Sequence, residues 1–130
     1  TGRLLDVIDW LSTRPESRGL KIGCFGASTG GGAALSAAAA RPEVVAAVVS
    51  RGGRPDLAGA EALAGVRAPT LLVVGGADGP VVALNREAMA RMSAPVALEV
   101  VPGASHLFEE PGTLEEVARL ARDWFGRHLS

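Results

Sequence analysis

The stretch GASTGGG, Gly26 to Gly32, follows the apolar run LKIGCF and precedes the alanine-rich segment AALSAAAA. A glycine cluster between an apolar strand and a helix builds one of two kinds of turn. In a nucleophile elbow the pattern is GxSxG, which places Ser28 at the apex. In a dinucleotide-binding turn, glycines let the backbone approach the phosphates, and Gly26, Gly30 and Gly32 match a GxxxGxG spacing of that kind. The rest of the sequence has to separate these two hypotheses.

Apolar strands and helices alternate along the chain. Apolar residues recur at helical spacing from Leu4 to Leu11, which predicts an amphipathic helix closed by Pro15. Asp56 is placed to cap a short helix, and Thr113 and Glu116 are spaced as a capping box before the last helix. The other segments expected are strands at 20–25, 44–49, 70–74 and 97–101, and helices at 29–40 and 81–92.

Strands this apolar need cover on both faces. Helical segments join them, so the pattern predicts an α/β fold with a small, mostly parallel four-stranded sheet and helices on both faces. No internal repeat or linker interrupts the 130 residues, and we expect a single domain over 1–130.

Composition excludes several classes of function. Thirteen basic residues face fourteen acidic ones without a block of like charge, so we expect neither nucleic acid nor a membrane as partner. One cysteine, Cys24, and two distant histidines leave no spacing for a disulfide or a metal site, and no cofactor is expected. The single cysteine fits a reducing cytoplasm, and no apolar run is long enough to suggest a membrane span. We expect Cys24 to be a small core residue.

The dinucleotide hypothesis can be tested against the chemistry of short-chain dehydrogenases. Arg51 ends a predicted strand, where an arginine could meet a 2′-phosphate. Catalysis in that family uses a tyrosine with a lysine four residues later, however. This chain has no tyrosine, and its one lysine, Lys21, precedes the glycine turn. The nucleophile elbow is therefore the favoured interpretation.

A hydrolase elbow requires an acid and a histidine after the serine, in that order. Asp78 follows the third predicted strand in VVGGADG, and His106 follows the fourth in VVPGASHLF. Because carboxyl ends of parallel strands meet at one edge of a sheet, these side chains should converge on Ser28. The amide of Thr29 is the expected oxyanion donor at the start of a helix.

Each candidate has a plainer alternative. Asp78 could cap the following helix, with Glu109 or Glu110 as the acid instead. His106 could be a surface-loop histidine, as we expect His128 to be. Gly26 and Gly30 are expected to be glycines because side chains there would crowd strand against helix. Arg51 and Arg54, in SRGGRPD, are either surface charges or contacts to the substrate.

The motifs GASTG, GGADG and GASHLFEEPG resemble the carboxyl-terminal half of the α/β-hydrolase fold, most closely the dienelactone hydrolase-like branch. The resemblance implies a reduced fold that lacks the amino-terminal strands, and a hydrolase acting on small esters. Dienelactone hydrolases proper carry cysteine at the apex, so Ser28 points to the serine esterases of the superfamily.

The resemblance also implies what is missing. The family's second oxyanion donor follows an earlier strand that this sequence does not contain, and losing one donor typically lowers turnover by about 10²- to 10³-fold. A weak esterase is therefore expected. The alternative is a non-catalytic fragment or assembly module that keeps the elbow only as structure.

The strand Leu20 to Phe25 has no earlier strand to pair with and carries only Lys21 as a charge. Exposed sheet edges are usually protected by charge, proline or bulges. We therefore expect a twofold homodimer that covers this edge and the adjoining helices, and a partner amide near Ser28 could serve as the second oxyanion donor.

Overall fold

The computed structural model describes residues 2–14 and 21–129, and Leu20 and Pro15 lie outside them. Nine regular elements and one short 3-10 helix, η1, follow one another in these residues. In chain order they are α1 (Gly2–Thr13), β1 (Ile22–Ala27), α2 (Thr29–Ala40), β2 (Val45–Arg51), η1 (Pro55–Ala58), α3 (Ala60–Gly65), β3 (Thr70–Gly75), α4 (Gly79–Ala90), β4 (Val96–Val101) and α5 (Thr113–His128).

The four strands form one parallel sheet in the order β1-β2-β3-β4. The register aligns Cys24 with Val48, Val48 with Thr70, and Thr70 with Val96. In the described part of the chain, β1 and β4 are the edge strands. The predicted α/β class, the parallel sheet and its four strands are confirmed.

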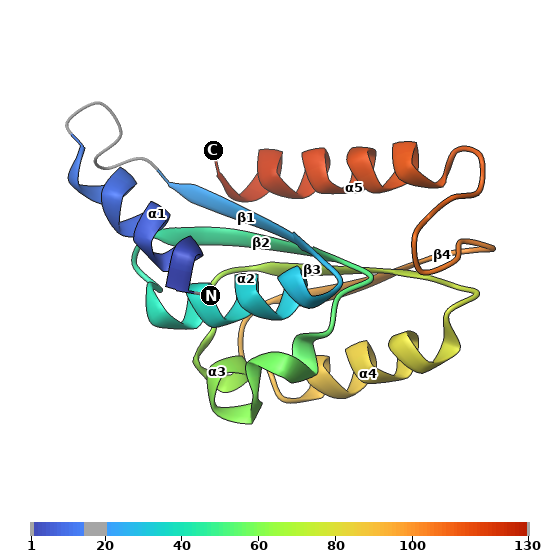
Figure 1. Cartoon of the computed structure of the whole chain (residues 1–130), viewed down its shortest axis with the longest axis horizontal. Helices are drawn as coiled ribbons and strands as arrows, with labels where there is room; N and C mark the ends of the chain where they lie inside the picture. Colours follow the sequence, from blue (N-terminus) through green and yellow to red (C-terminus); the bar gives the residue numbers. More distant parts are fainter. Residues whose placement is uncertain (1, 15–20, 130) are drawn as a thin grey trace.

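Helices cover both faces of the sheet (Figure 1). The helix α5 lies along one face, and α2, α3 and α4 lie on the other, with α1 beside α2. Successive residues of β2 point to opposite faces, so Val48 packs in the core under α2 and Val49 packs in the core under α5. Trp124 of α5 closes the second core.

The strand β1 is less buried than its apolar sequence predicts. Cys24 is buried, whereas its neighbour Phe25 is 50% exposed. The opposite exposure of these neighbours follows from the edge position of β1, because the two faces of an edge strand are covered by different elements. The face that carries Phe25 therefore lacks the cover expected for so apolar a strand, while the predicted edge position of β1 is found in the described residues. None of the helices in residues 2–14 and 21–129 has the length and apolarity needed to cross a membrane.

Two predicted helix caps are wrong. Gly112, with φ 83°, precedes α5, and no side chain caps this helix. The Thr113 hydroxyl instead donates backwards to the carbonyls of Phe108 and Glu110, at 2.8 and 2.7 Å. Asp56 lies inside η1 rather than ahead of a helix. Its carboxylate accepts from the guanidinium of Arg54, which lowers the pKa of Asp56.

Candidate active site

Ser28 is the single residue between β1 and α2. Its backbone has φ 51° and ψ −122°, a conformation that residues other than glycine rarely adopt. Its amide donates to the carbonyl of Arg51 at 3.2 Å. Its carbonyl accepts from the amides of Gly31 and Arg54, at 3.1 and 3.0 Å. Such strained positions cost about 1–3 kcal/mol and persist only where surrounding contacts enforce them. These three backbone hydrogen bonds hold the sharp turn predicted from GASTG.

Gly26 is the glycine that this turn requires. A methyl group on its α-carbon would overlap the carbonyl group of Gly30. Gly30 itself is different, because a methyl group there would meet nothing within 4 Å beyond its own helix. The prediction that side chains at both positions would crowd strand against helix holds for Gly26 and is wrong for Gly30.

Ser28, Asp78 and His106 lie together at the carboxyl edge of the sheet. The Ser28 hydroxyl oxygen is 2.9 Å from Nε2 of His106. On the other side of the ring, Nδ1 lies 3.0 Å from an Asp78 carboxylate oxygen. The second contact has the distance of an ion pair but not the alignment of an N–H hydrogen bond. A ring protonated at Nδ1 leaves Nε2 free to accept the serine proton.

The loops that carry Asp78 and His106 are bonded to each other. The amide of Ala77 donates to the carbonyl of Ala104 at 3.0 Å, which joins the turn after β3 to the loop after β4. Asp78 occupies the position before α4 but makes no capping hydrogen bond, so its carboxylate serves His106 instead. The capping alternative for Asp78 is therefore wrong.

Glu110 holds the loop that carries His106 and is not the acid next to the ring. Its carboxylate accepts from the Ser105 amide at 2.9 Å and lies 3.3 Å from the Ser105 hydroxyl. The Ser105 amide lowers the pKa of Glu110 below its usual range. Glu109, the other substitute acid considered, is exposed.

The remaining predicted site residues lie around this centre. Thr29 begins α2 directly after Ser28, and no hydrogen bond within the described residues occupies its amide. Arg54 is held by both carboxylate oxygens of Asp56, at 3.0 and 2.9 Å, and this contact raises the pKa of Arg54. The guanidinium carbon of Arg51 lies 5.6 Å from the centre of the Phe108 ring, and its Nε is buried without a hydrogen-bond partner among residues 2–14 and 21–129.

Two other candidates lie away from the site. His128 is the last residue of α5, with its ring 4.4 Å from that of Trp124. It is therefore a half-buried helical residue, and the expectation of a surface loop is wrong. Cys24 is buried in the core under α2, as expected, and burial raises the pKa of its thiol.

Three residues that were not predicted as part of the site, Ser50, Gly53 and Asn85, pack behind the elbow. Ser50 and Asn85 are both fully buried, and Gly53 lies between them. The glycine pair at 52–53 was a visible signal of close backbone approach at the end of a strand. Asn85 interrupts the apolar spacing of its helix between Val81 and Ala88, which signals a buried polar group.

A strained serine turn after one strand, followed by an acid and a histidine after later strands, defines the α/β-hydrolase class of proteins. Residues 1–129 match the model of the family described as "Dienelactone hydrolase family". The chain belongs to this family. Family and fold agree with the resemblance found in the sequence motifs.

Solved structures place the chain in the same class. A dienelactone hydrolase from Anabaena variabilis ATCC 29413 is 58% identical, with a TM-score of 0.95 over 98% of this chain and 59% of that one. A "predicted CIB-like hydrolase" from Thermoplasma acidophilum is 27% identical, with a TM-score of 0.73 over 95% of this chain and 58% of the other. Both of these solved structures are described as hydrolases, and both share the fold of this chain.

A curated relative carries a different description. A protein of Mycobacterium tuberculosis (strain ATCC 25618 / H37Rv), named "Putative phosphoribosyl transferase", is 61% identical over 127 residues. These residues are 98% of this chain and 28% of that protein. The chain thus spans under a third of this relative's length and about three fifths of the Anabaena hydrolase.

Proposed function

We propose that the chain is a serine hydrolase that cleaves small carboxylic esters through an acyl-enzyme intermediate. The observation that carries the proposal is the 2.9 Å contact between the Ser28 hydroxyl oxygen and Nε2 of His106. A serine hydroxyl is a weak nucleophile at neutral pH unless a base accepts its proton. The contact supplies that base, at a turn that projects the hydroxyl from the sheet.

In the acylation step, the Ser28 hydroxyl oxygen attacks the ester carbonyl carbon while its proton passes to Nε2 of His106. The carbonyl oxygen becomes an oxyanion and accepts a hydrogen bond from the amide of Thr29. Collapse of the tetrahedral intermediate breaks the bond to the alcohol oxygen. The alcohol leaves with the proton from His106, and the acyl group remains on Ser28.

Deacylation repeats these transfers with water. The oxygen of a water molecule attacks the acyl carbon while His106 takes a proton from that water. His106 then gives the proton to the oxygen of Ser28. The products are the carboxylic acid and the free serine. Asp78, 3.0 Å from Nδ1, stabilises the imidazolium that forms in both steps.

The proposal favours short acyl groups. Within residues 21–129 the site-bearing loops are brief, and the longest of them runs over residues 102–112 between β4 and α5. A long acyl chain needs a tunnel or lid that covers its apolar surface, and these loops are too short to build one. Hydrolysis should therefore fall from acetate to long-chain esters.

The direct test is labelling with a fluorophosphonate probe, located by mass spectrometry, together with hydrolysis of p-nitrophenyl acetate. We expect the probe on Ser28, and we expect Ser28→Ala to lower turnover by about 10³-fold or more. Ser36→Ala is the matched control, because Ser36 lies half-buried on the same α2 helix, away from His106.

Two results would overturn the proposal. One is a folded chain in which Ser28 stays unlabelled, and the other is a Ser28→Ala variant that hydrolyses the ester as fast as the Ser36→Ala control. Either result would favour the alternative that the chain is a non-catalytic module that retains the elbow as structure. Cys24 does not confuse the labelling, because its thiol is buried.

Arg51 and Arg54 are proposed contacts to the polar end of the substrate. Arg51 is the better candidate, since Arg54 is already paired with Asp56. Phosphoribosyl transfer, the activity in the name of the mycobacterial relative, is not proposed for this chain, which covers 28% of that protein.

A further inference from the structure

The chain has one asparagine and no glutamine, and that asparagine is fully buried outside the catalytic centre. Asn85 lies on α4, the helix that begins directly after Asp78. Its side-chain nitrogen donates to the carbonyl of Gly53 at 3.1 Å and to the carbonyl of Val81, in its own helix, at 2.8 Å. The first of these bonds crosses from α4 to the loop after β2.

That loop supports the nucleophile. The residue after Gly53 is Arg54, whose amide donates to the carbonyl of Ser28 at 3.0 Å. A methyl group on either Gly53 or Gly31 would overlap the hydroxyl oxygen of the buried Ser50, so the loop and the start of α2 pack backbone to backbone. A displacement of Gly53 would therefore move the carbonyl of Ser28.

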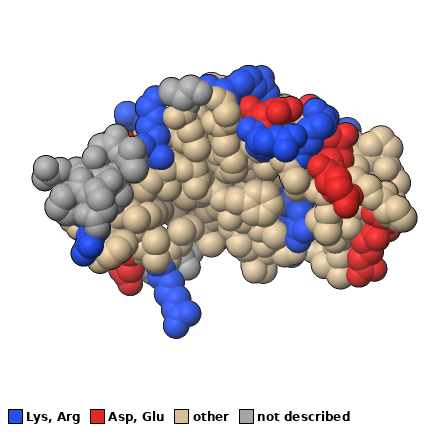
Figure 2. Space-filling view, turned by 90° about the horizontal axis from the view of Figure 1, so that it is seen from above, with Lys and Arg blue, Asp and Glu red and all other residues tan. Residues whose placement is uncertain are grey.

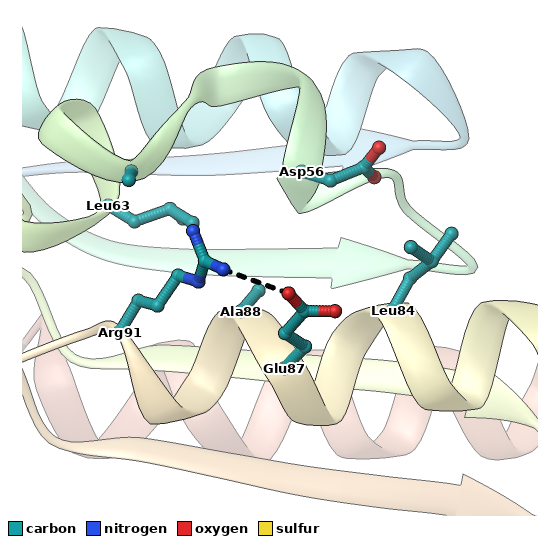
Figure 3. A pocket seen from close by; sticks show the side chains of 7 residues that line it. Asp56, Leu63, Leu84, Glu87, Ala88 and Arg91 are labelled. Atoms are coloured by element: carbon teal, nitrogen blue, oxygen red, sulfur yellow. Dashed lines mark hydrogen bonds and ion pairs between the residues drawn. The ribbon is translucent and has the colours of Figure 1, made fainter.

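Close packing does not extend along the whole of the α4 surface that faces η1 and α3. Where α4 faces η1 and α3, the structure leaves a cavity of about 170 Å³, lined in part by Leu63, Leu84 and Ala88 (Figure 3). Its charged groups are paired: Arg91 binds Glu87 (Figure 3), and Asp56 binds Arg54. We assign no ligand to it. The hydrogen bond from Asn85 to the carbonyl of Gly53 joins α4 to the loop after β2.

We propose that Asn85 is a positioning residue that fixes the position of Ser28, at the elbow, relative to that of Asp78. Through Gly53 and Arg54 it acts on the carbonyl of Ser28, and through α4 it acts on Asp78. The inference rests on the proposed function, because this relative position matters only if Ser28, His106 and Asp78 react together.

Stability alone does not explain the choice of asparagine at this position. The side-chain oxygen of Asn85 is buried and has no hydrogen-bond partner among the described residues. A buried polar atom left without a partner costs about 1–3 kcal/mol, and leucine, whose side chain has the same branched shape, would avoid that cost. The amide is therefore explained better by the bond that it makes to Gly53 than by packing.

The test compares two substitutions that remove this bond differently. Asn85→Leu removes the amide and keeps the branched shape of the side chain. Asn85→Ser keeps a donor for the Val81 carbonyl of the same helix but is too short to reach Gly53. The control is Ala88→Gly, a destabilising change at a buried position of α4 that leaves the bond to Gly53 intact.

Turnover of p-nitrophenyl acetate by the folded fraction should fall about 10- to 100-fold in both Asn85 variants, as expected for small misplacements of a reacting group. The KM should stay within about threefold, because the ester does not contact Asn85. Exchange of the Arg54 amide hydrogen, followed by NMR, should accelerate at least about tenfold. The Ala88→Gly control should lose stability while its folded fraction keeps its turnover.

The two proposals fail in different ways. If the unsubstituted chain neither hydrolyses the ester nor accepts the probe, the proposed function fails. If the Arg54 amide exchanges at the unsubstituted rate in both Asn85 variants, the positioning inference fails, whatever the activity. Turnover that follows only the folded fraction in Asn85→Leu and Asn85→Ser would overturn it as well.

Discussion

Gly26 and Gly30 are four residues apart in the same turn, yet only Gly26 has no room for a side chain. Both glycines satisfy the GxSxG pattern, so the pattern alone treats them alike. The difference arises because the carbonyl of Gly30 points at the α-carbon of Gly26, whereas the α-carbon of Gly30 faces open space. Alanine substitutions at these two positions therefore show which glycine of the motif the turn requires.

Gly26→Ala should lower the free energy of unfolding by about 3 kcal/mol, because its methyl group overlaps a backbone carbonyl that cannot move without disturbing Ser28. Gly30→Ala should raise it by up to about 1 kcal/mol, since alanine favours the helix and meets no neighbour. Urea denaturation of the two variants checks both signs. Equal effects at the two positions would contradict the geometry of the turn.

The three side chains of the site could be found from the sequence because their chemistry is ordered along the chain. Ser28, Asp78 and His106 each follow an apolar strand, and parallel strands bring such positions to one edge. Asn85 could not be placed in the same way. Its partner, Gly53, is 32 residues away, and the contact depends on how α4 packs against the loop. Local patterns carry no information about that packing.

At the scale of elements, the loop between β4 and α5 is fixed by polar contacts rather than by a helix cap. The spacing of Thr113 and Glu116 predicted a capping box, but Gly112 takes the left-handed conformation at the start of α5. Thr113 then turns back to the carbonyls of Phe108 and Glu110. Apolar periodicity predicted the strands and helices because it is a local property. It does not predict this loop, which is fixed by hydrogen bonds from the Thr113 side chain to backbone carbonyls.

Glu110 gives this loop a pH-dependent anchor. Its folded-state pKa is lower than the usual 4.5, first because the Ser105 amide donates to it. A lowered pKa contributes stability above the unfolded-state value, and this contribution is lost as the pH falls through the folded-state value. Glu110→Gln should therefore be less stable than the unsubstituted chain at neutral pH, and the difference should shrink in acid below about pH 4.5.

Thermal unfolding measured from neutral pH into acid checks this prediction. Glu109→Gln is the matched control, because it removes the same charge from the exposed neighbouring position. We expect it to change the melting temperature little at any pH. A difference for Glu110→Gln that stays constant into strong acid would show that the carboxylate charge does not anchor the loop.

At the scale of the whole molecule, charge and apolar surface are unevenly distributed. The face seen from above is charged along its margins and largely uncharged in its middle (Figure 2). Gly23 packs beneath Phe125 of α5, so Phe25, two residues further along the edge strand β1, points to the same face and is half exposed. On α1, Val7 and Trp10 are also more than half exposed.

We propose that this chain forms a twofold homodimer in solution that covers the edge of β1, because an apolar edge without charge or proline favours pairing with a second copy. Phe25→Glu places a charge on that edge and should yield a monomer. Leu114→Glu changes an exposed apolar residue of α5 in the same way and should leave the dimer intact. Sedimentation or light scattering at micromolar concentration distinguishes the two species.

The dimer also bears on catalysis, because a backbone amide of the second copy near Ser28 would add an oxyanion donor to that of Thr29. Specific activity should then fall as dilution separates the copies, and Phe25→Glu should lose turnover by up to about 10²-fold, the usual effect of removing one donor. Activity per chain that is unchanged on dilution would remove the shared donor and leave the dimer standing. A monodisperse monomer of the unsubstituted chain would contradict both the dimer and the shared oxyanion donor, because Phe25 would then remain exposed to solvent.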